Sequence, residues 1–256
     1  MTRELRGTSF EVATLNTEGG RHHDLVTEFL ATRSLDVVFL QEVNCADLVA
    51  FSELGYYCYF APTTLVQRSG TNEARPQGVA VLSRSALRDI RRHYYFTGNR
   101  KPGELLIAGN RDPNKIQKVI LSGVMPDTGI RVGTTHFTWS ANGEANDDQL
   151  RDVESLLLCL SHVEEPLVWG GDMNAPRGGV IADRVSQYFL SAVPEDITST
   201  IDPNLHCVKG LQLVVDYLFS SHHTYVDGVT AADGISDHIA LIGRAGLREL
   251  VHSVLA

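Results

Sequence analysis

Short apolar runs separated by polar or glycine-containing segments recur along the chain and predict a series of strands. Residues 10–16 alternate apolar and polar side chains, as a strand with one buried face does. Residues 36–41, whose centre is the apolar run 37–40, predict a buried strand, and residues 167–171 predict another strand. Further strands are expected at residues 56–62, 78–83, 118–124, 130–136, 211–220, 225–229 and 239–242.

Helical spacing of apolar residues predicts helices between several of these strands. It occurs at residues 23–33 and at 46–54, where Gly55 follows as a stop signal. A short terminal helix is expected at 246–255. The polar segment 63–77 contains glycine and proline and is long enough to be a functional loop.

The clearest helix is expected at residues 144–160. Leu150, Val153, Leu157 and Leu160 follow one another at helical spacing and fall on one face. The segment therefore predicts an amphipathic helix that covers a sheet with this face.

The organisation of the chain indicates one folded unit. Hydrophobic residues make up 43% and charged residues 21% of the 256 residues, which favours a substantial core over disorder. No linker, internal repeat or low-complexity tract divides the sequence. We therefore expect residues 1–256 to form a single α/β domain with two sheets and helices outside them.

The formal net charge of −9 limits the class of partner. A protein that binds long duplex DNA over its whole surface is usually basic, so a compact substrate or a local basic patch is favoured. The four cysteines lack metal-ligand spacing, residues 1–9 lack an apolar signal core, and no apolar run approaches the length of a membrane span. These features predict a cytoplasmic protein with reduced thiols, no membrane contact and no obligate protein partner.

Polar residues follow the apolar strands at five places in the chain. They are Asn16, Glu42, His136, Asp172 with Asn174, and Asp237 with His238. Strand ends at one edge of a sheet converge, so these side chains are expected to lie close together. Carboxylate and amide oxygens suit Mg²⁺ or Mn²⁺ better than Zn²⁺. Such a set can assist the attack of water on a phosphate ester.

Each of these positions also has a simpler structural explanation. Asn16 can start a turn, and Glu42 can cap the helix that follows it. The segment from Asp172 to Asn174 can be a turn, and His136 can be a half-buried, hydrogen-bonded histidine. It is the combination and order of the residues that favour a catalytic site.

The motifs that contain these residues resemble one known family. In chain order they are Leu-Asn16, Gln41-Glu42-Val, Gly78-Val-Ala-Val-Leu-Ser-Arg84, Thr135-His136, Gly171-Asp172-Met-Asn174, Asp216-Tyr-Leu-Phe219 and Ser236-Asp237-His238. Over roughly residues 9–243, this order is similar to that of the endonuclease/exonuclease/phosphatase superfamily, which has the deoxyribonuclease-like fold. The resemblance implies a four-layer α/β/β/α sandwich of two packed mixed sheets flanked by helices.

The resemblance also implies roles for the acidic and amide residues. Glu42 is similar to the principal metal ligand, with Asn16 beside it and Asp237 completing the acidic pocket. Asp172 is similar to the group that orients and deprotonates the attacking water. Asn174 would donate to the phosphoryl oxygens in the transition state.

Two histidines would contact the phosphate. His238 resembles the histidine that hydrogen-bonds it, Asp216 resembles the orienting carboxylate of that histidine, and His136 resembles a second phosphate-contacting histidine. The chain departs from many relatives at Val214, where an arginine is common, and at Trp139. Trp139 could stack on a base or ring, although a core tryptophan is the more common case.

These observations favour a phosphoesterase that depends on Mg²⁺ or Mn²⁺ and cleaves a phosphodiester, in a short or single-stranded nucleic acid or a nucleotide. Four basic residues are candidates for substrate contacts: Arg68, Arg75, Arg100 and Lys101. They could equally be solvated loop residues. A phosphomonoesterase, a phosphodiesterase acting on another small molecule, and a catalytically silent binding module remain alternatives.

Overall fold

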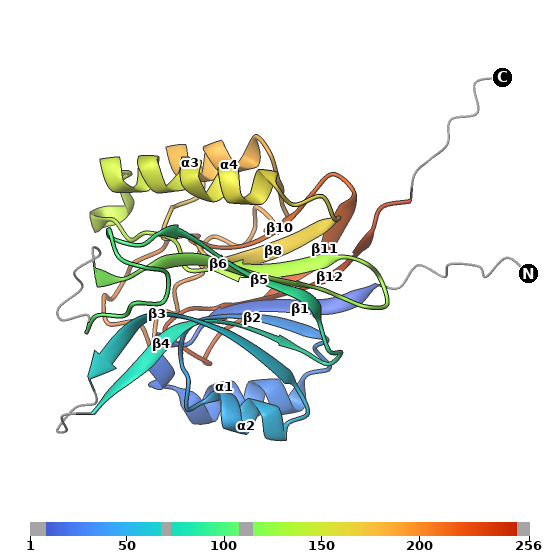
Figure 1. The fold of residues 1–256 in the computed structure, drawn as a ribbon, viewed down its shortest axis with the longest axis horizontal. Coiled ribbons are helices and arrows are strands. Elements are labelled where there is room, and N and C mark those ends of the chain that lie inside the picture. Colours follow the sequence, from blue (N-terminus) through green and yellow to red (C-terminus); the bar gives the residue numbers. More distant parts are fainter. Residues whose placement is uncertain (1–8, 68–72, 108–114, 250–256) are drawn as a thin grey trace, which may run out of the picture.

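Two mixed sheets of six strands each pack face to face at the centre of the molecule (Figure 1). The computed structural model describes residues 9–67, 73–107 and 115–249. Helices cover the outer faces of both sheets, so the layers follow the order α/β/β/α. This arrangement confirms the predicted four-layer sandwich.

The two sheets divide the chain unequally. The first has the strand order β11-β12-β1-β2-β4-β3 and takes strands from both ends of the sequence. Its strands are β1 (Phe10–Asn16), β2 (Val37–Asn44), β3 (Tyr57–Gln67), β4 (Ala74–Ser83), β11 (Thr224–Ala232) and β12 (Ala240–Leu247). The second has the order β5-β6-β7-β8-β10-β9. Its strands are β5 (Arg88–Phe96), β6 (Lys118–Val124), β7 (Arg131–Thr135), β8 (Leu167–Asp172), β9 (Leu190–Ser191) and β10 (Asp216–Ser220).

Each sheet contains one pair of parallel strands near its centre. These pairs are β1 with β2 and β7 with β8, whereas the other neighbouring strands are antiparallel. The carboxyl ends of a parallel pair meet at one edge, as Asn16 and Gln41 do by pairing in register. Because β2 also contacts β7 and β8 across the sandwich, all four carboxyl ends approach one another.

Helices bury their apolar stripes against the outside of the sheets. They are α1 (His23–Thr32), α2 (Leu48–Glu53), α3 (Asp147–Ser161) and α4 (Val180–Ser186), with 3-10 turns at Glu18–Gly20 and Ala141–Gly143. Val26 and Leu30, one turn apart on α1, pack in one cluster with Leu40 and Leu82 of the first sheet. None of the helices in the described parts of the chain is long and apolar enough to cross a membrane.

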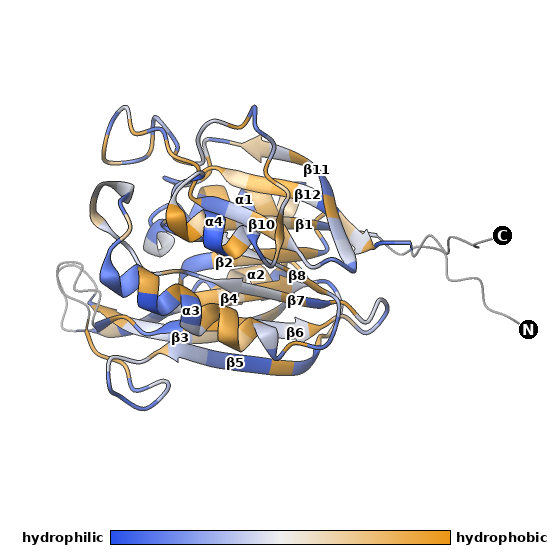
Figure 2. Cartoon of the chain, turned by 90° about the horizontal axis from the view of Figure 1, so that it is seen from above, coloured by the Kyte–Doolittle hydropathy of each residue, from blue (hydrophilic) through white to orange (hydrophobic). Residues whose placement is uncertain are grey.

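A second apolar cluster fills the space between the sheets and continues under α3 and α4. Phe39 of β2 and Trp169 of β8 are fully buried in it, and the Trp169 ring stacks on Phe219 with 4.5 Å between ring centroids. Apolar residues predominate in the central strands, whereas β5 is largely hydrophilic (Figure 2). The central strands therefore form a rigid base for the polar residues at their ends.

One buried polar side chain joins the two sheets. Gln41 of β2 donates from Nε2 to the hydroxyl of Thr14 on β1 at 3.2 Å and to that of Thr134 on β7 at 2.9 Å. The amide therefore connects the sheets directly beneath the edge where the parallel strands end. Its N–H groups are therefore hydrogen-bonded, whereas its buried Oε1 has no hydrogen-bond partner among the described residues.

The polar segment 63–77 is not a loop, and this prediction is wrong for most of its length. The strand β3 continues to Gln67 and β4 begins at Ala74, with Leu65 paired to Pro76. Polar residues suit this hairpin because β3 is the last strand of its sheet, and one side of an edge strand faces solvent.

Other element boundaries also differ from those predicted. The strand expected at 211–220 begins only at Asp216, and β12 occupies the start of the helix expected at 246–255. Residues 250–256 lie outside the described residues. The hydrophobic pattern did not predict β5 or the short helix α4. The three arginines of β5 obscure the apolar alternation that would have indicated this edge strand.

The amphipathic helix is present as α3, but its buried face differs by one position from the prediction. Leu150 is 43% exposed, whereas the polar residues Gln149 and Asp152 are buried beside Val153 and Leu157. The apolar pattern missed this because both polar side chains are satisfied by hydrogen bonds with the segment after β7.

Candidate active site

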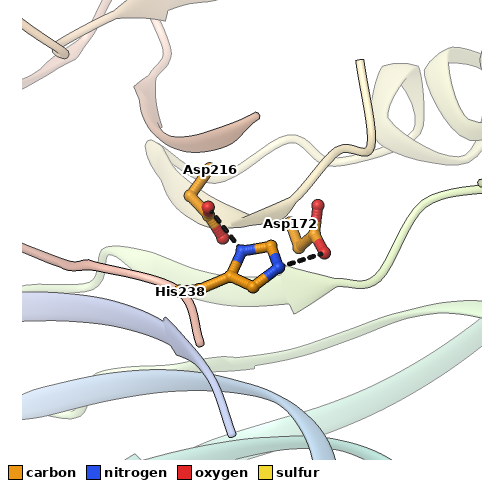
Figure 3. A group of neighbouring side chains, drawn as sticks. All are labelled: Asp172, Asp216 and His238. Carbon is orange, nitrogen blue, oxygen red and sulfur yellow. Dashed lines mark hydrogen bonds and ion pairs between the residues drawn. The ribbon is translucent and has the colours of Figure 1, made fainter. Parts of the chain in front are cut away.

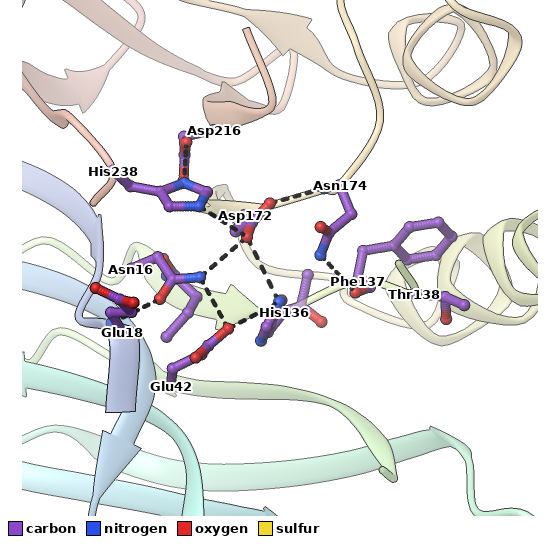
Figure 4. A network of polar contacts seen from close by, with 12 residues as sticks. Asn16, Glu18, Glu42, His136, Phe137, Thr138, Asp172, Asn174, Asp216 and His238 are labelled. Atoms are coloured by element: carbon purple, nitrogen blue, oxygen red, sulfur yellow. Dashed lines mark hydrogen bonds and ion pairs between the residues drawn. The ribbon is translucent and has the colours of Figure 1, made fainter. Parts of the chain in front are cut away.

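A cavity of about 380 Å³ opens where the parallel strands end. Its polar lining comes from both sheets and the loops beside them: Asn16, Glu42, Lys118, His136, Ser140, Asp172, Asn174, His206, Cys207, Asp237 and His238. Its apolar lining includes Ile116, Trp139, Ile201, Val208, Leu211, Leu213 and Val215. The structure thus brings together all the residues predicted for catalysis and metal binding, with Asp216 joined to them through His238. Figure 4 labels all of these residues except Asp237.

Glu42 is directed into the cavity by an irregularity in β2. The pairing of β2 with β4 shifts register between Leu40 and Val43, and Glu42 has a positive φ of 55°. A bulge of this kind turns one side chain away from the regular alternation of the strand, at a cost in backbone strain. Burial raises the pKa of Glu42, and the nearby carboxylate of Asp172 raises it further.

Asn16 connects the two carboxylates at the centre of the cavity. Its Nδ2 donates to Oδ2 of Asp172 at 3.0 Å and to Oε1 of Glu42 at 3.4 Å. Its Oδ1 accepts from the backbone N–H of Glu18 at 3.0 Å. In this orientation Asn16 holds both carboxylates, and its predicted role beside a metal would require the amide to present its oxygen instead.

Asp172, the last residue of β8, is the most highly connected group of the site. Only 2% of its side chain is exposed, and it pairs in register with Asp216 of β10. Gly171 before it has a φ of 143°, and a Cβ there would lie 2.0 Å from the carbonyl oxygen of Thr135. Glycine at this position therefore lets β8 approach the end of β7.

The turn after Asp172 fixes Asn174. The backbone N–H of Asn174 donates to Oδ1 of Asp172 at 2.8 Å, and its Nδ2 donates to the carbonyl oxygen of Phe137 at 3.1 Å. Asn174 has a positive φ of 47°, which asparagine adopts more readily than most residues. The second N–H of this side-chain amide makes no hydrogen bond with the described residues.

His238 lies between two carboxylates (Figure 3). Its Nδ1 is 2.8 Å from Oδ2 of Asp216, and its Nε2 is 3.9 Å from Oδ2 of Asp172. Although burial opposes a charge here, the carboxylates of Asp216 and Asp172 raise the pKa of His238 well above its usual value. His238 is therefore a charged imidazolium at neutral pH, held in place from behind by Asp216.

His136 has the opposite electrostatic character. Its Nε2 is 3.5 Å from Oδ2 of Asp172 and 3.9 Å from Oε1 of Glu42. Burial lowers the pKa of His136 to about 4, and the nearby charge of Lys118 contributes to this. The cavity therefore contains one charged and one neutral histidine, both facing Asp172.

Asp237 completes the acidic lining. Burial raises the pKa of its carboxyl group, and the negative charges of Glu18 and Glu42 raise it further, against the effect of His238. The three residues that line the cavity with carboxylates therefore come from β2, the end of β8 and the segment before β12. Among the buried residues that the structure describes, Asp172, Asp216 and His238 also lie close enough together to hold a metal ion. Both nitrogens of His238, however, already face carboxylates in this cluster.

Two buried residues of this region have no counterpart in the predicted site. Lys118, the first residue of β6, lines the cavity and donates to the carbonyl oxygen of Phe137. Gln149 of α3 donates to the carbonyl oxygens of Thr138 and Asn174 and so joins the segments after β7 and β8. Two features of the sequence could have indicated these residues. Lys118 begins an otherwise apolar strand, and Gln149 lies next to the apolar stripe of a helix.

The predicted substrate contacts are only partly near the cavity. Trp139 lines it and is 44% exposed, so it is not a core residue. Arg75 of β4 pairs with Glu73, which precedes the strand. Arg100 and Lys101 follow β5, and none of these three basic residues lines the cavity. Arg68 lies outside the described residues.

Val214 and its surroundings form part of the scaffold. Val214 is buried, and its carbonyl oxygen accepts from the backbone N–H of Arg177. The guanidinium of Arg177 donates to the carbonyl oxygens of Val193, Pro194 and Ile197. This nearby arginine therefore holds a loop and does not line the cavity.

Comparison with solved structures shows the same fold in several proteins. An endonuclease/exonuclease/phosphatase from Beutenbergia cavernae has a TM-score of 0.70 and 16% identity, and the match covers 93% of this chain and 72% of that one. TDP2 from D. rerio, complexed with a single-strand DNA product, has a TM-score of 0.66 and 12% identity, covering 93% and 99%. ANGEL2, described as a 2′,3′-cyclic phosphatase in complex with adenosine-2′,3′-vanadate, has a TM-score of 0.64 and 15% identity, covering 96% and 97%.

Sequence comparison assigns the family. A search of the curated proteins found no match. The model of the Endonuclease/Exonuclease/phosphatase family matches residues 13–238, which contain every residue of the cavity discussed above. The chain therefore belongs to the endonuclease/exonuclease/phosphatase family.

Proposed function

We propose that the chain is a divalent-metal-dependent phosphoesterase that hydrolyses a phosphodiester in a nucleic-acid end or a nucleotide. The observation that carries this proposal is the position of Asp172. Its carboxylate lies in one cavity with the neutral His136, the charged His238 and the acidic Glu42. These groups can activate water and stabilise a phosphoryl group at the same place.

Asp172 is the residue that would accept a proton from the attacking water. Hydrogen bonds from Asn16 and from the backbone of Asn174 hold both of its oxygens in position. His238 would donate from Nε2 to a phosphoryl oxygen, and Asp216 would keep the imidazole charged and correctly oriented. His136 and the amide of Asn174 would donate to the remaining oxygens as negative charge develops.

A divalent cation fits the acidic side of the cavity. Members of the family usually depend on such a metal. Glu42 and Asp237 would hold the cation, because burial and neighbouring carboxylates disfavour ionisation of both acidic groups without a compensating charge. Asn16 would join them with its amide turned so that Oδ1, and not Nδ2, faces the cation. Oxygen donors suit Mg²⁺ or Mn²⁺. When bound, the cation supplies positive charge to the phosphoryl and leaving oxygens.

The surroundings of the cavity support a substrate of nucleotide size. Its volume of about 380 Å³ is within the range of small-molecule sites, and the exposed ring of Trp139 can stack on a base. The buried Gln117 binds the carbonyl oxygens of Lys101 and Thr97, so the basic segment after β5 is attached beside Lys118. The DNA product in TDP2 and the adenosine compound in ANGEL2 support the same substrate class.

The reaction is tested by comparing bis-p-nitrophenyl phosphate with p-nitrophenyl phosphate, each with Mg²⁺ and with Mn²⁺. We expect faster hydrolysis of the diester and complete loss of activity in EDTA. Faster hydrolysis of the monoester would instead indicate a phosphomonoesterase. Full activity in EDTA would exclude the metal-dependent mechanism.

The nucleic-acid part of the proposal is tested by the salt dependence of oligonucleotide binding at fixed Mg²⁺. In a plot of the logarithm of the binding constant against the logarithm of salt concentration, each phosphate neutralised by a protein cation steepens the negative slope by about 0.7–0.9. Because the chain is acidic, we expect a slope equivalent to only about two or three phosphates. Replacing Arg68, Arg75, Arg100 and Lys101 with alanine should weaken oligonucleotide cleavage and leave hydrolysis of bis-p-nitrophenyl phosphate unchanged. An unchanged rate of oligonucleotide cleavage in this variant would reject these contacts.

A further inference from the structure

Lys118 is a buried lysine at the centre of an acidic protein. It is the first residue of β6 and only 3% exposed, and its side chain lines the cavity together with Asp172 and Asn174. Among the described residues that line the cavity, it is the only lysine or arginine. Burial of an ammonium group is costly unless the charge is compensated, so a lysine at this place requires a physical reason.

The ammonium group is fixed by one hydrogen bond. Its Nζ donates to the carbonyl oxygen of Phe137 at 3.1 Å, and no other hydrogen bond from it is seen in the described parts of the chain. An ammonium group has three N–H donors, so two remain for other partners. Burial lowers the pKa of Lys118 to about 8, while Asp172, Asp152 and Glu42 favour its charged form. Lys118 is therefore mostly charged at neutral pH.

Lys118 and Asn174 form a pair of donors anchored on the same atom. The carbonyl oxygen of Phe137 accepts from Nζ of Lys118 and from Nδ2 of Asn174, each at 3.1 Å. The backbone N–H of Phe137 in turn donates to the carbonyl oxygen of Asp172 at 2.8 Å. The side chains of Lys118 and Asn174 are thus held on one carbonyl group, whose residue is itself bonded to the backbone of Asp172, and Lys118, Asn174 and Asp172 all line the cavity.

From this geometry we propose that Lys118 is a substrate-binding residue whose ammonium group binds a non-bridging oxygen of the phosphate. The inference rests on the proposed phosphoesterase function. A fixed cation next to a fixed amide donor matches the separate oxygens of a phosphoryl group, and such charge-assisted hydrogen bonds are the strong ones. Lys118 would bind the phosphate from the side of the second sheet, whereas Glu42 belongs to the first sheet.

A purely structural role would have a different signature. Lys118 is close enough to Asp152 and Asp172 for their charges to affect its pKa, so it could serve only to compensate them. In that case its replacement would lower the stability of the fold but leave the affinity for phosphate unchanged. The two roles are therefore separated by measuring phosphate binding and thermal unfolding on the same variants.

The test uses the full chain with Lys118→Met and Lys118→Gln, the second of which keeps an N–H donor for the Phe137 carbonyl. Arg244→Met is the matched control, because it also removes one positive charge but lies exposed on β12 and does not line the cavity. Affinity for inorganic phosphate is measured by titration calorimetry, in EDTA and with Mn²⁺. We expect both Lys118 variants to bind phosphate at least about tenfold more weakly than the wild type and Arg244→Met to bind it normally.

Hydrolysis of bis-p-nitrophenyl phosphate is measured in parallel. We expect kcat/KM to fall by at least about tenfold in both Lys118 variants. Phosphate affinity within twofold of the wild type in a folded Lys118→Gln protein would overturn the inference, as would a wild-type protein that binds no phosphate under either condition. If the wild type binds phosphate but hydrolyses neither ester, the proposed function fails, and weaker phosphate binding by the variants still supports the role of Lys118.

Discussion

The pair formed by Asp216 and His238 allows a prediction whose size follows from the structure. The two side chains are buried and joined by a 2.8 Å contact, and the second oxygen of Asp216 has no hydrogen-bond partner among the described residues. A hydrogen bond to a charged group contributes about 1.5–3 kcal/mol, and 1.36 kcal/mol corresponds to a tenfold change in rate. Asp216→Asn should therefore lower kcat by about 10- to 150-fold.

The loss should also depend on pH. Because Asp216 raises the pKa of His238, its replacement with asparagine should let the imidazole lose its proton at lower pH. We expect the decline of kcat on the alkaline side to begin at lower pH in Asp216→Asn. The raised pKa also means that the charged pair stabilises the fold at low pH and that this contribution falls as pH rises through the folded-state pKa of His238. The difference in Tm from the wild type should accordingly be larger at pH 6 than at pH 9.

The assay is the pH–rate profile of bis-p-nitrophenyl phosphate hydrolysis for Asp216→Asn, His238→Ala and the double variant. Asp227→Asn is the matched control, since Asp227 is exposed on β11 and does not line the cavity. If the pair acts as one unit, the double variant should be little slower than His238→Ala. Additive losses, or a loss in Asp216→Asn that is the same at every pH, would refute the reasoning.

Three further predictions follow from other residues. Glu42→Gln should abolish metal-dependent hydrolysis. Its Tm in EDTA should be unchanged or higher than that of the wild type, because burial already disfavours the ionised carboxylate. A large drop in Tm would instead show that Glu42 has a structural role. Asp172→Asn should lower kcat by ~10²–10⁴ with little change in KM, and a wild-type kcat would rule it out as the base. The bond from the buried Arg131 lowers the pKa of Glu165 to about 2, so this ion pair stabilises the fold above pH 4.5 and loses its effect as pH falls towards 2. In denaturant unfolding, Glu165→Gln should lower stability at pH 7 by roughly 2–3 kcal/mol, and the same difference at pH 3 as at pH 7 would contradict this assignment.

Much of the fold could be predicted because the central strands are apolar on both faces. The strands that contain Phe39 and Trp169 are buried between layers, so their sequences carry an unambiguous signal. The sequences of edge strands carry a weaker signal, because β5 and the hairpin of β3 and β4 place polar residues towards solvent. The end of strand β12 was also predicted wrongly, because residues 246 and 247 belong to the strand and not to the helix expected at 246–255.

The site was predictable where a residue lies at a strand end and belongs to a motif: Asp172 ends β8, whereas His238, expected after a strand, comes just before β12. The sequence did not indicate Lys118 or Gln149, because each is held in place by partners distant in the chain. Lys118 is placed by the carbonyl oxygen of Phe137, and Gln149 by carbonyl oxygens after β7 and β8. A pattern of apolar spacing contains no information on such contacts, and a polar residue on a helix is usually solvated.

The amide of Gln41 has a consequence for how activity and stability relate in this protein. Among the residues of the proposed active site, Asn16 and Glu42 belong to the first sheet and Asp172 belongs to the second, so their separation is only as well defined as the alignment of the two sheets. Apolar packing between the sheets favours contact but tolerates small sliding movements, whereas the hydrogen bond from Gln41 to Thr134 fixes one relative position. Replacing this amide with an apolar side chain could therefore preserve a stable protein in which the two halves of the site no longer meet at the correct distance. The alignment of the two sheets thus depends on Gln41, whereas the stability of the fold depends mainly on the apolar residues packed between the sheets.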